Sequence, residues 1–76
     1  MTLTGAQVRA ARTLLGWPQH RVADELRTRL SEHRSFEAGI VELSALQTSL
    51  LKRILAAAGI EFDDKGHGVR MREGKP

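Results

Sequence analysis

The chain has 76 residues, a formal net charge of +3 and no cysteine. A chain this short forms one domain at most, which needs dense helix packing or a partner, and the lack of cysteine excludes disulfides and thiolate metal sites. No apolar run approaches the roughly 20 residues of a membrane span, and the N-terminus lacks the layout of a signal peptide, so we expect a cytoplasmic protein.

The excess of positive charge lies entirely in the first 29 residues. Five arginines there oppose Asp24 and Glu25, whereas residues 30–76 balance seven basic against seven acidic side chains. This distribution is compatible with a surface that faces phosphate groups. It lacks the dense basic stripe that is typical of a dedicated nucleic-acid-binding protein.

The first 26 residues predict two helices joined by a tight connection. Thr4 and Gln7 fit a capping box at the start of the first helix, and Gly16 fits its end. Pro18 fits the first turn of a second helix, which runs to about Leu26. The apolar residues of the first helix recur at helical spacing: Val8, Ala11, Leu14 and Leu15.

Two more helices are expected before residue 60. The third covers residues 30–38, with Gly39 as its stop. A second capping box, Ser44 with Gln47, starts the fourth helix, which ends at Gly59. Its wide apolar face favours a place in the core over a coiled-coil seam and consists of Leu46, Leu50, Leu51, Ile54, Leu55 and Ala58.

The pattern after the fourth helix changes from helical spacing to strict alternation. Residues 60–62 and 69–71 each read apolar, charged, apolar, and residues 63–68 between them are rich in turn formers, which predicts a β-hairpin. Because an isolated hairpin is marginal in water, its apolar side chains should pack on the fourth helix or pair with another chain. The expected fold is mainly α, a compact domain of four to five helices with a short C-terminal β-hairpin. The expected parts are a helical domain over 1–59, the hairpin over 60–72 and a flexible tail over 73–76.

Four short segments, in order and in register, resemble the XRE-type (lambda-repressor-like) helix-turn-helix family. They are GAQVRAAR at 5–12, LGWPQ at 15–19, VA at 22–23 and FEAG at 36–39. The resemblance covers roughly residues 4–58, and the "GIEF" and "GVR" segments after it are similar to the tails of short proteobacterial members. It implies a helix-turn-helix domain, with Arg12 and Glu37 joined in a structural ion pair.

The resemblance also indicates which positions would contact DNA. Family members that bind DNA use a glutamine at the start of the second helix and long polar side chains early in the third, whose forked ends match base edges. If DNA binding is retained here, the candidate contacts are Gln19, Arg21, Ser31, Arg34 and Ser35. The serines are short, however, Leu30 offers only apolar contact, and Glu32 brings a carboxylate towards the phosphates.

The third helix departs from the family in its scaffold as well. Arg27 stands where the family favours glycine, and Thr28 and His33 stand where it has buried aliphatic side chains. Arg29 replaces the usual small polar cap, so the helix start loses an acceptor. Together these departures indicate a recognition helix that no longer reads DNA.

Two hypotheses of function follow, both concerning transcription regulation in a bacterial cytoplasm. In the favoured one, Leu30 with Arg27, Arg29 and Arg34 binds a transcriptional activator protein, as an apolar anchor with a charged rim. The chain would then be similar to the small antiactivators that control transfer of conjugative elements. In the alternative, it is a dimeric repressor of the XRE type that binds operator DNA. A monomer and a homodimer are both compatible with the sequence.

Catalysis, metals, cofactors and small-molecule ligands have little support. The three histidines, at positions 20, 33 and 67, lack the spacing of a metal site. Ser31, Glu32 and His33 are consecutive on a helix and point in different directions, so they cannot form a catalytic relay. Trp17 is expected to pack beside the first helix junction. We therefore expect no enzyme activity.

Overall fold

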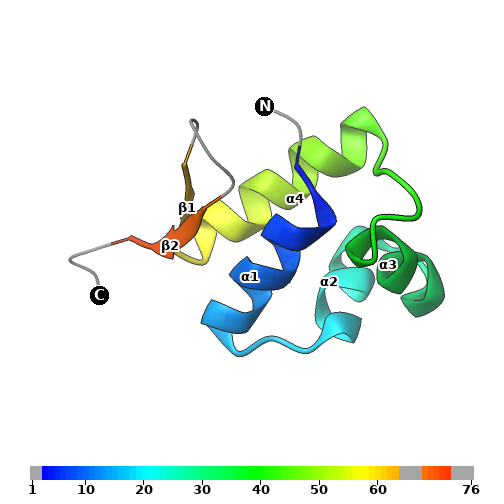
Figure 1. The fold of residues 1–76 in the computed structure, drawn as a ribbon, viewed down its shortest axis with the longest axis horizontal. Coiled ribbons are helices and arrows are strands. Elements are labelled where there is room, and N and C mark those ends of the chain that lie inside the picture. The colour runs from blue at the N-terminus through cyan, green and yellow to red at the C-terminus, as the bar shows by residue number, and fades with distance from the viewer. Residues whose placement is uncertain (1–2, 64–67, 73–76) are drawn as a thin grey trace.

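The computed structural model describes residues 3–63 and 68–72 as a helical body with a hairpin at one end (Figure 1). The two strands of the hairpin and the pair α2 and α3 lie at opposite ends of the molecule, with α1 and α4 between them. This confirms the expected mainly-α fold with a short hairpin. The elements are α1 (Gly5–Leu15), α2 (Gln19–Leu26), α3 (Leu30–Glu37), α4 (Ala45–Ala57), β1 (Ile60–Phe62) and β2 (Val69–Met71).

Local side-chain chemistry sets the starts of the helices. Thr4 Oγ1 accepts a hydrogen bond from the Gln7 N–H at 3.1 Å, and Gln7 Oε1 accepts one from the Thr4 N–H at 2.8 Å. Ser44 and Gln47 repeat this reciprocal pair at the start of α4, at 3.1 and 3.0 Å. Both predicted capping boxes are therefore present. Pro18 precedes α2 as its cap and does not lie in the first turn, one residue from the expected place.

The hydrophobic core lies between the four helices and includes Ile60 of the hairpin. Leu51 and Leu55 form the α4 side of this core and are completely buried. Leu46 and Leu50, expected on the same face, are 79% and 38% exposed, because at 3.6 residues per turn they lie at least about 100° around the helix from the buried pair. The core side chains are Leu3, Val8, Ala11, Val22, Leu26, Phe36, Leu51, Leu55 and Ile60.

The hairpin packs on the helices of its own chain, which is one of the two alternatives expected for its apolar face. The antiparallel strands place Ile60 opposite Met71 and Phe62 opposite Val69. Ile60 is buried, and Phe62 and Val69 pack against the core, whereas Met71 is exposed. Strand β1 contacts α4 and strand β2 contacts α1. Most of the predicted turn (64–67) and the predicted tail (73–76) lie outside the described residues.

Within residues 3–63 and 68–72, no helix combines the length and the apolar character needed to cross a lipid bilayer.

Gly5, the first residue of α1, lies directly against the end of α3. A Cβ atom on Gly5 would lie 2.1 Å from the Phe36 carbonyl oxygen and 2.7 Å from the Glu37 Cα. The two helices therefore approach each other through their backbones, and no side chain fits at this position. Sequence alone gives no sign of this contact, because it depends on how two helices distant in the chain cross.

Replacing Gly5 with alanine should lower the free energy of unfolding by about 3 kcal/mol, the upper part of the range for overpacked sites, because the backbone of α3 must move. Urea unfolding followed by circular dichroism measures this loss. Gly39→Ala is the matched control, since its added methyl group meets no atom within 4 Å at a φ of 81°. The control should cost only the strain of a left-handed backbone, about 1–2 kcal/mol. Equal losses in the two variants would contradict the close α1–α3 contact.

Candidate functional site

The turn between α2 and α3 depends on a left-handed arginine. Arg27 has φ 59° and ψ 42°, a conformation in which the Cβ of an L-residue is crowded. Its N–H donates to the Asp24 carbonyl at 3.1 Å, and the Thr28 N–H donates to the Ala23 carbonyl at 2.9 Å, so the turn closes the end of α2. The resemblance implies glycine at position 27, and glycine would adopt these backbone angles without strain.

Beneath α3, the Glu37 carboxylate lies in a fully buried position, with 0% of its side chain exposed. Arg12 of α1 binds it with a fork: Nε lies 2.9 Å from Oε2 and Nη2 lies 3.1 Å from Oε1. The remaining Arg12 nitrogen, Nη1, donates to the Trp17 carbonyl at 2.8 Å. The structure therefore brings together the two residues for which the resemblance implied an ion pair. Trp17 packs against the core, as expected.

Two more side chains form hydrogen bonds to the same carboxylate, and sequence reasoning missed both bonds; Arg9 Nε also lies 3.7 Å from Glu37 Oε1. Gln19 Nε2 of α2 donates to Glu37 Oε1 at 3.1 Å. His33 of α3 is 2% exposed and places its Nε2 in contact with Glu37 Oε2. The spacing of four residues between His33 and Glu37 was the one available signal, because such pairs share a helix face.

Hydrogen bonding outweighs burial in setting the charge of Glu37. Burial raises the pKa of its carboxyl group, but the donors Arg12, Gln19 and His33 together hold that pKa below its ordinary value of 4.5. A carboxylate with several donors is favoured in its charged form. Glu37 is therefore an anion at neutral pH, and the His33 Nε2–H donates to it.

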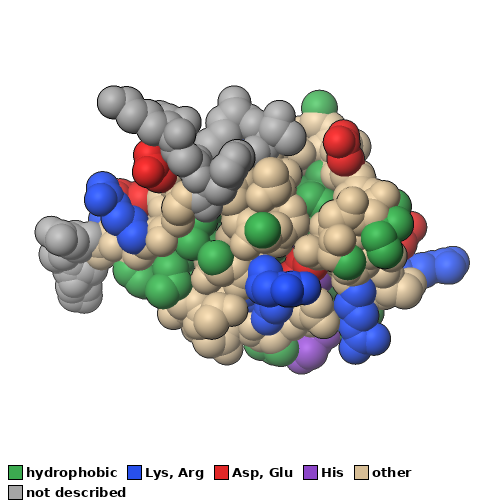
Figure 2. Space-filling view, viewed as in Figure 1, with side chains coloured by type: hydrophobic (Ala, Val, Ile, Leu, Met, Phe, Trp, Pro, Cys, Tyr) green, Lys and Arg blue, Asp and Glu red, His purple; other side chains and the backbone are tan. Residues whose placement is uncertain are grey.

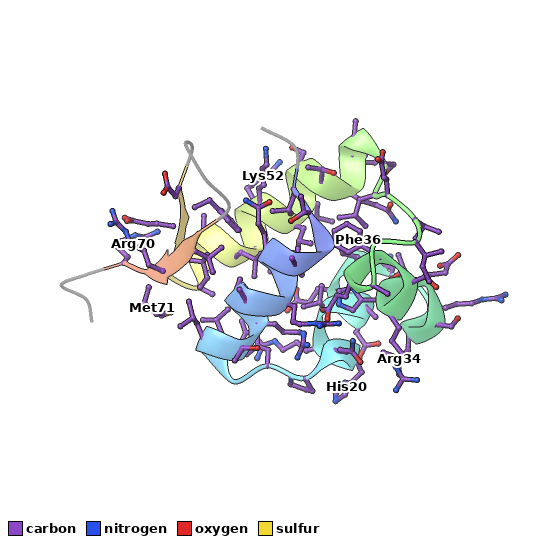
Figure 3. All side chains as sticks on the ribbon, viewed as in Figure 1. His20, Arg34, Phe36, Lys52, Arg70 and Met71 are labelled. Atoms are coloured by element: carbon purple, nitrogen blue, oxygen red, sulfur yellow. The ribbon has the colours of Figure 1, made fainter. Side chains whose placement is uncertain are left out.

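The network extends to the surface through Gln19. While its amide nitrogen donates to Glu37, its Oε1 accepts from Arg34 Nε at 3.3 Å. Arg34 points away from the core, on the same side of the molecule as His20 of α2 (Figure 3). We call Arg12, Gln19, His33, Arg34 and Glu37 the Glu37 network.

The other predicted partner-binding residues lie at the start of α3. Arg27 and Arg29 are exposed, whereas Leu30, expected as the apolar anchor, is half-buried. Leu30 is the first residue of the helix. Lys and Arg side chains lie in separate groups, some over the helices and one at the hairpin end of the molecule (Figure 2).

The remaining candidate contacts to DNA are only partly available. Ser31 is exposed and Ser35 is half-buried. The Arg21 guanidinium stacks 4.0 Å from the centre of the Trp17 ring, and its Nε lies 3.6 Å from Glu25. The Arg21 guanidinium therefore already contacts Trp17 and Glu25 within the chain.

The start of α3 uses an acidic side chain in place of the missing cap. The Glu32 carboxylate accepts from the Arg29 N–H at 3.3 Å, and a carboxylate in the first turn of a helix is favoured by the helix dipole. The Arg29 guanidinium has no acceptor to offer in return. Glu32 thus has a structural contact that the sequence pattern did not reveal.

Ser31, Glu32 and His33 do not form a relay, because Glu32 binds the Arg29 N–H and His33 binds Glu37. Among the described residues, no group of three or more His, Cys, Asp or Glu side chains is placed to hold a metal ion. His67 lies outside those residues.

Compared with known protein families, curated proteins and solved structures, the chain has no match. The site is therefore interpreted from its own residues and geometry.

Replacing Glu37 with glutamine should lower the free energy of unfolding by about 3–5 kcal/mol at pH 7, because it leaves the partly buried Arg12 charge uncompensated. The variant should also respond differently to acid. Because the pKa of Glu37 is lowered by folding, the ionised carboxylate stabilises the native chain above the ordinary value of 4.5, and this stabilisation is lost as pH falls through the lowered pKa. Thermal unfolding between pH 7 and pH 3 measures both effects.

Glu25→Gln is the matched control, since Glu25 is an exposed carboxylate on α2 whose pair with Arg21 contributes little. The control should keep the stability of the original chain at pH 7 to within about 0.5 kcal/mol. If Glu37→Gln lost as much stability on acidification as the original chain does, Glu37 would not be the group responsible.

Proposed function

We propose that the chain is a small helix-turn-helix regulator of transcription that binds a partner regulatory protein. The contact is made by the turn surface, which we define as Arg27, Arg29, Leu30 and Arg34. The observation that carries this proposal is the left-handed backbone of Arg27.

An arginine is costly at this turn unless its side chain is needed. The left-handed conformation costs an L-residue about 1–2 kcal/mol that glycine avoids. Within the described part of the chain, the exposed Arg27 side chain has no hydrogen bond or ion pair that would offset this cost. Strained residues that persist without an internal benefit are typical of functional sites. This supports a contact between Arg27 and another molecule.

The turn surface matches a partner with an acidic rim and an apolar pocket. Arg27, Arg29 and Arg34 are exposed guanidinium groups, and Leu30 between them is half-buried. Arginine forms forked bonds to carboxylates, and a partly exposed leucine adds apolar area at the centre. An anchor with a charged rim is the usual anatomy of a protein interface.

DNA reading receives weaker support from the same residues. Gln19 would have to read phosphate or base edges, but both ends of its amide are used inside the chain, by Glu37 and by Arg34. Ser31 is too short to discriminate strongly between bases. The proposal therefore favours an antiactivator, which binds an activator protein and does not bind operator DNA.

The alternative is a dimeric repressor of the XRE type. It is favoured by the exposed arginines, which would also bind phosphate. A mobility-shift assay on the DNA upstream of its own gene, at two salt concentrations, separates the two functions. A specific shift that weakens steeply with salt would exclude the antiactivator, whereas the proposal expects no specific shift and co-purification of a regulatory protein.

Replacing Arg27 with glycine should raise the free energy of unfolding by about 1 kcal/mol, because the left-handed strain is relieved. The same variant should bind the co-purified regulator several-fold more weakly. Urea unfolding and a pull-down titration measure the two changes. A gain in stability with unchanged binding would contradict a contact role for Arg27.

Replacing Leu30 with glutamate should abolish binding to the regulator and keep the fold, because an acidic residue is well tolerated in the first turn of a helix. Circular dichroism checks the fold, and the pull-down measures binding. Leu46→Glu is the matched control, since Leu46 is 79% exposed on α4, and it should bind normally. Normal binding by the Leu30 variant would place the contact elsewhere.

A further inference from the structure

A groove of about 340 Å³ lies along α3 and includes the segment that leads from α3 to α4. The helix contributes Ser31, Glu32, His33, Ser35 and Phe36, and the segment contributes Val41, Glu42 and Leu43, with Thr28 and Gln47 completing the lining. We call it the α3 groove. The proposed function assigns no role to it.

Two residues that line the α3 groove each have a buried polar atom with no hydrogen-bond partner among the described residues: Thr28 Oγ1 and His33 Nδ1. With Arg29 as the cap of α3, Thr28 is the residue before the cap and His33 is the fourth residue of the helix. These two positions usually hold an apolar pair that packs together. Here they hold a hydroxyl group and an imidazole, which cost free energy when buried without a partner.

A His33 ring with a single proton would add a hydrogen-bond acceptor beside the groove. Its Nε2–H is directed to the ionised Glu37, so a ring with one proton has a free lone pair on Nδ1. The Thr28 hydroxyl can also accept. The groove therefore suits a group that donates hydrogen bonds.

The acidic side chains of the groove favour a cationic group as its ligand. Among the described residues, its lining includes the carboxylates of Glu32 and Glu42 and no lysine or arginine, although the whole chain carries a net charge of +3. Within the described residues, Glu42 has no ion pair. Phe36, Val41 and Leu43 add apolar walls that would cover the methylene stem of a long basic side chain.

The groove also has an apolar shoulder. Val41, which lines the groove, is 46% exposed, and its neighbour in the chain, Ile40, is 75% exposed; adjacent exposed apolar side chains are typical of a surface that a polypeptide covers. We propose that the α3 groove binds a lysine or arginine side chain of a partner protein, with an apolar residue of that partner on the Ile40–Val41 shoulder. This rests on the proposed function in assuming a protein partner, and it adds a second contact beside the turn surface.

The test titrates the full ¹⁵N-labelled chain with N-acetylarginine methylamide and, in parallel, with its neutral citrulline analogue. The arginine compound should give saturable shifts confined to amides 31–36 and 41–43 and a shift of the His33 Nδ1 resonance. The citrulline compound should bind at least about tenfold more weakly. Equal shifts from both compounds, or shifts scattered over other carboxylates, would overturn the proposal. No partner is used, so failure here leaves the proposed function untouched.

Matched variants assign the binding to the groove. Glu42→Gln should weaken the arginine compound several-fold, whereas Glu25→Gln, on α2 outside the groove, should not. Thr28→Val removes a buried hydroxyl without changing the shape, so it should raise the thermal midpoint of the free chain and weaken binding. A lowered midpoint would mean that Thr28 already has an internal partner, which would overturn its role in the groove.

A final comparison identifies the source of the cation. The capped tripeptide Leu-Arg-Leu should bind several-fold more tightly than N-acetylarginine methylamide, because its leucines reach the Ile40–Val41 shoulder. Equal affinities would indicate that the groove binds a free guanidinium or amine compound, and would overturn its assignment to a side chain of a partner protein.

Discussion

The buried Glu37 carboxylate is the interaction on which the arrangement of the helices depends. Its donors come from three elements: Arg12 from α1, Gln19 from α2 and His33 from α3. A buried charge is costly unless every side of it is satisfied, so moving any one of these helices removes a bond that the carboxylate needs. Apolar contacts alone tolerate sliding, whereas directional bonds fix how α3 lies on α1 and α2. The close contact at Gly5 belongs to the same junction, since it meets the backbone of Phe36 and Glu37.

The same constraint limits what the surface of α2 and α3 can do. If Gln19 turned outward to contact DNA, Glu37 would lose a donor while remaining buried, and Arg34 would lose its acceptor. The free-energy cost of rotating the Gln19 side chain therefore opposes a contact between Gln19 and DNA. Within the described residues, the side chains of Arg27 and Arg29 form no hydrogen bond or ion pair, so these two arginines can bind a partner without weakening the core.

The parts of this structure that follow from local chemistry could be predicted from the sequence, and those that depend on helix crossing could not. The capping boxes at Thr4 and Ser44 and the alternation of the hairpin strands are local patterns, and the structure has them. The bonds from Gln19 and His33 to Glu37 require knowing how α2 and α3 pack. The spacing of four residues between His33 and Glu37 indicates that they share a helix face. The family resemblance implied only Arg12 as a partner of Glu37.

The surface around α3 carries both signs of charge, and this bears on the kind of partner. Arg27, Arg29 and Arg34 are exposed, whereas Glu32 and Glu42 line the α3 groove. A DNA duplex presents phosphate anions along its whole surface, so it would be attracted by the arginines and repelled by the carboxylates of the groove. A protein can place carboxylates opposite the arginines and a basic side chain opposite the groove. Opposite charges on neighbouring patches fix the register of an interface and exclude wrong partners. The charge pattern of α3 therefore favours recognition of a protein over recognition of DNA, independently of the position of Gln19.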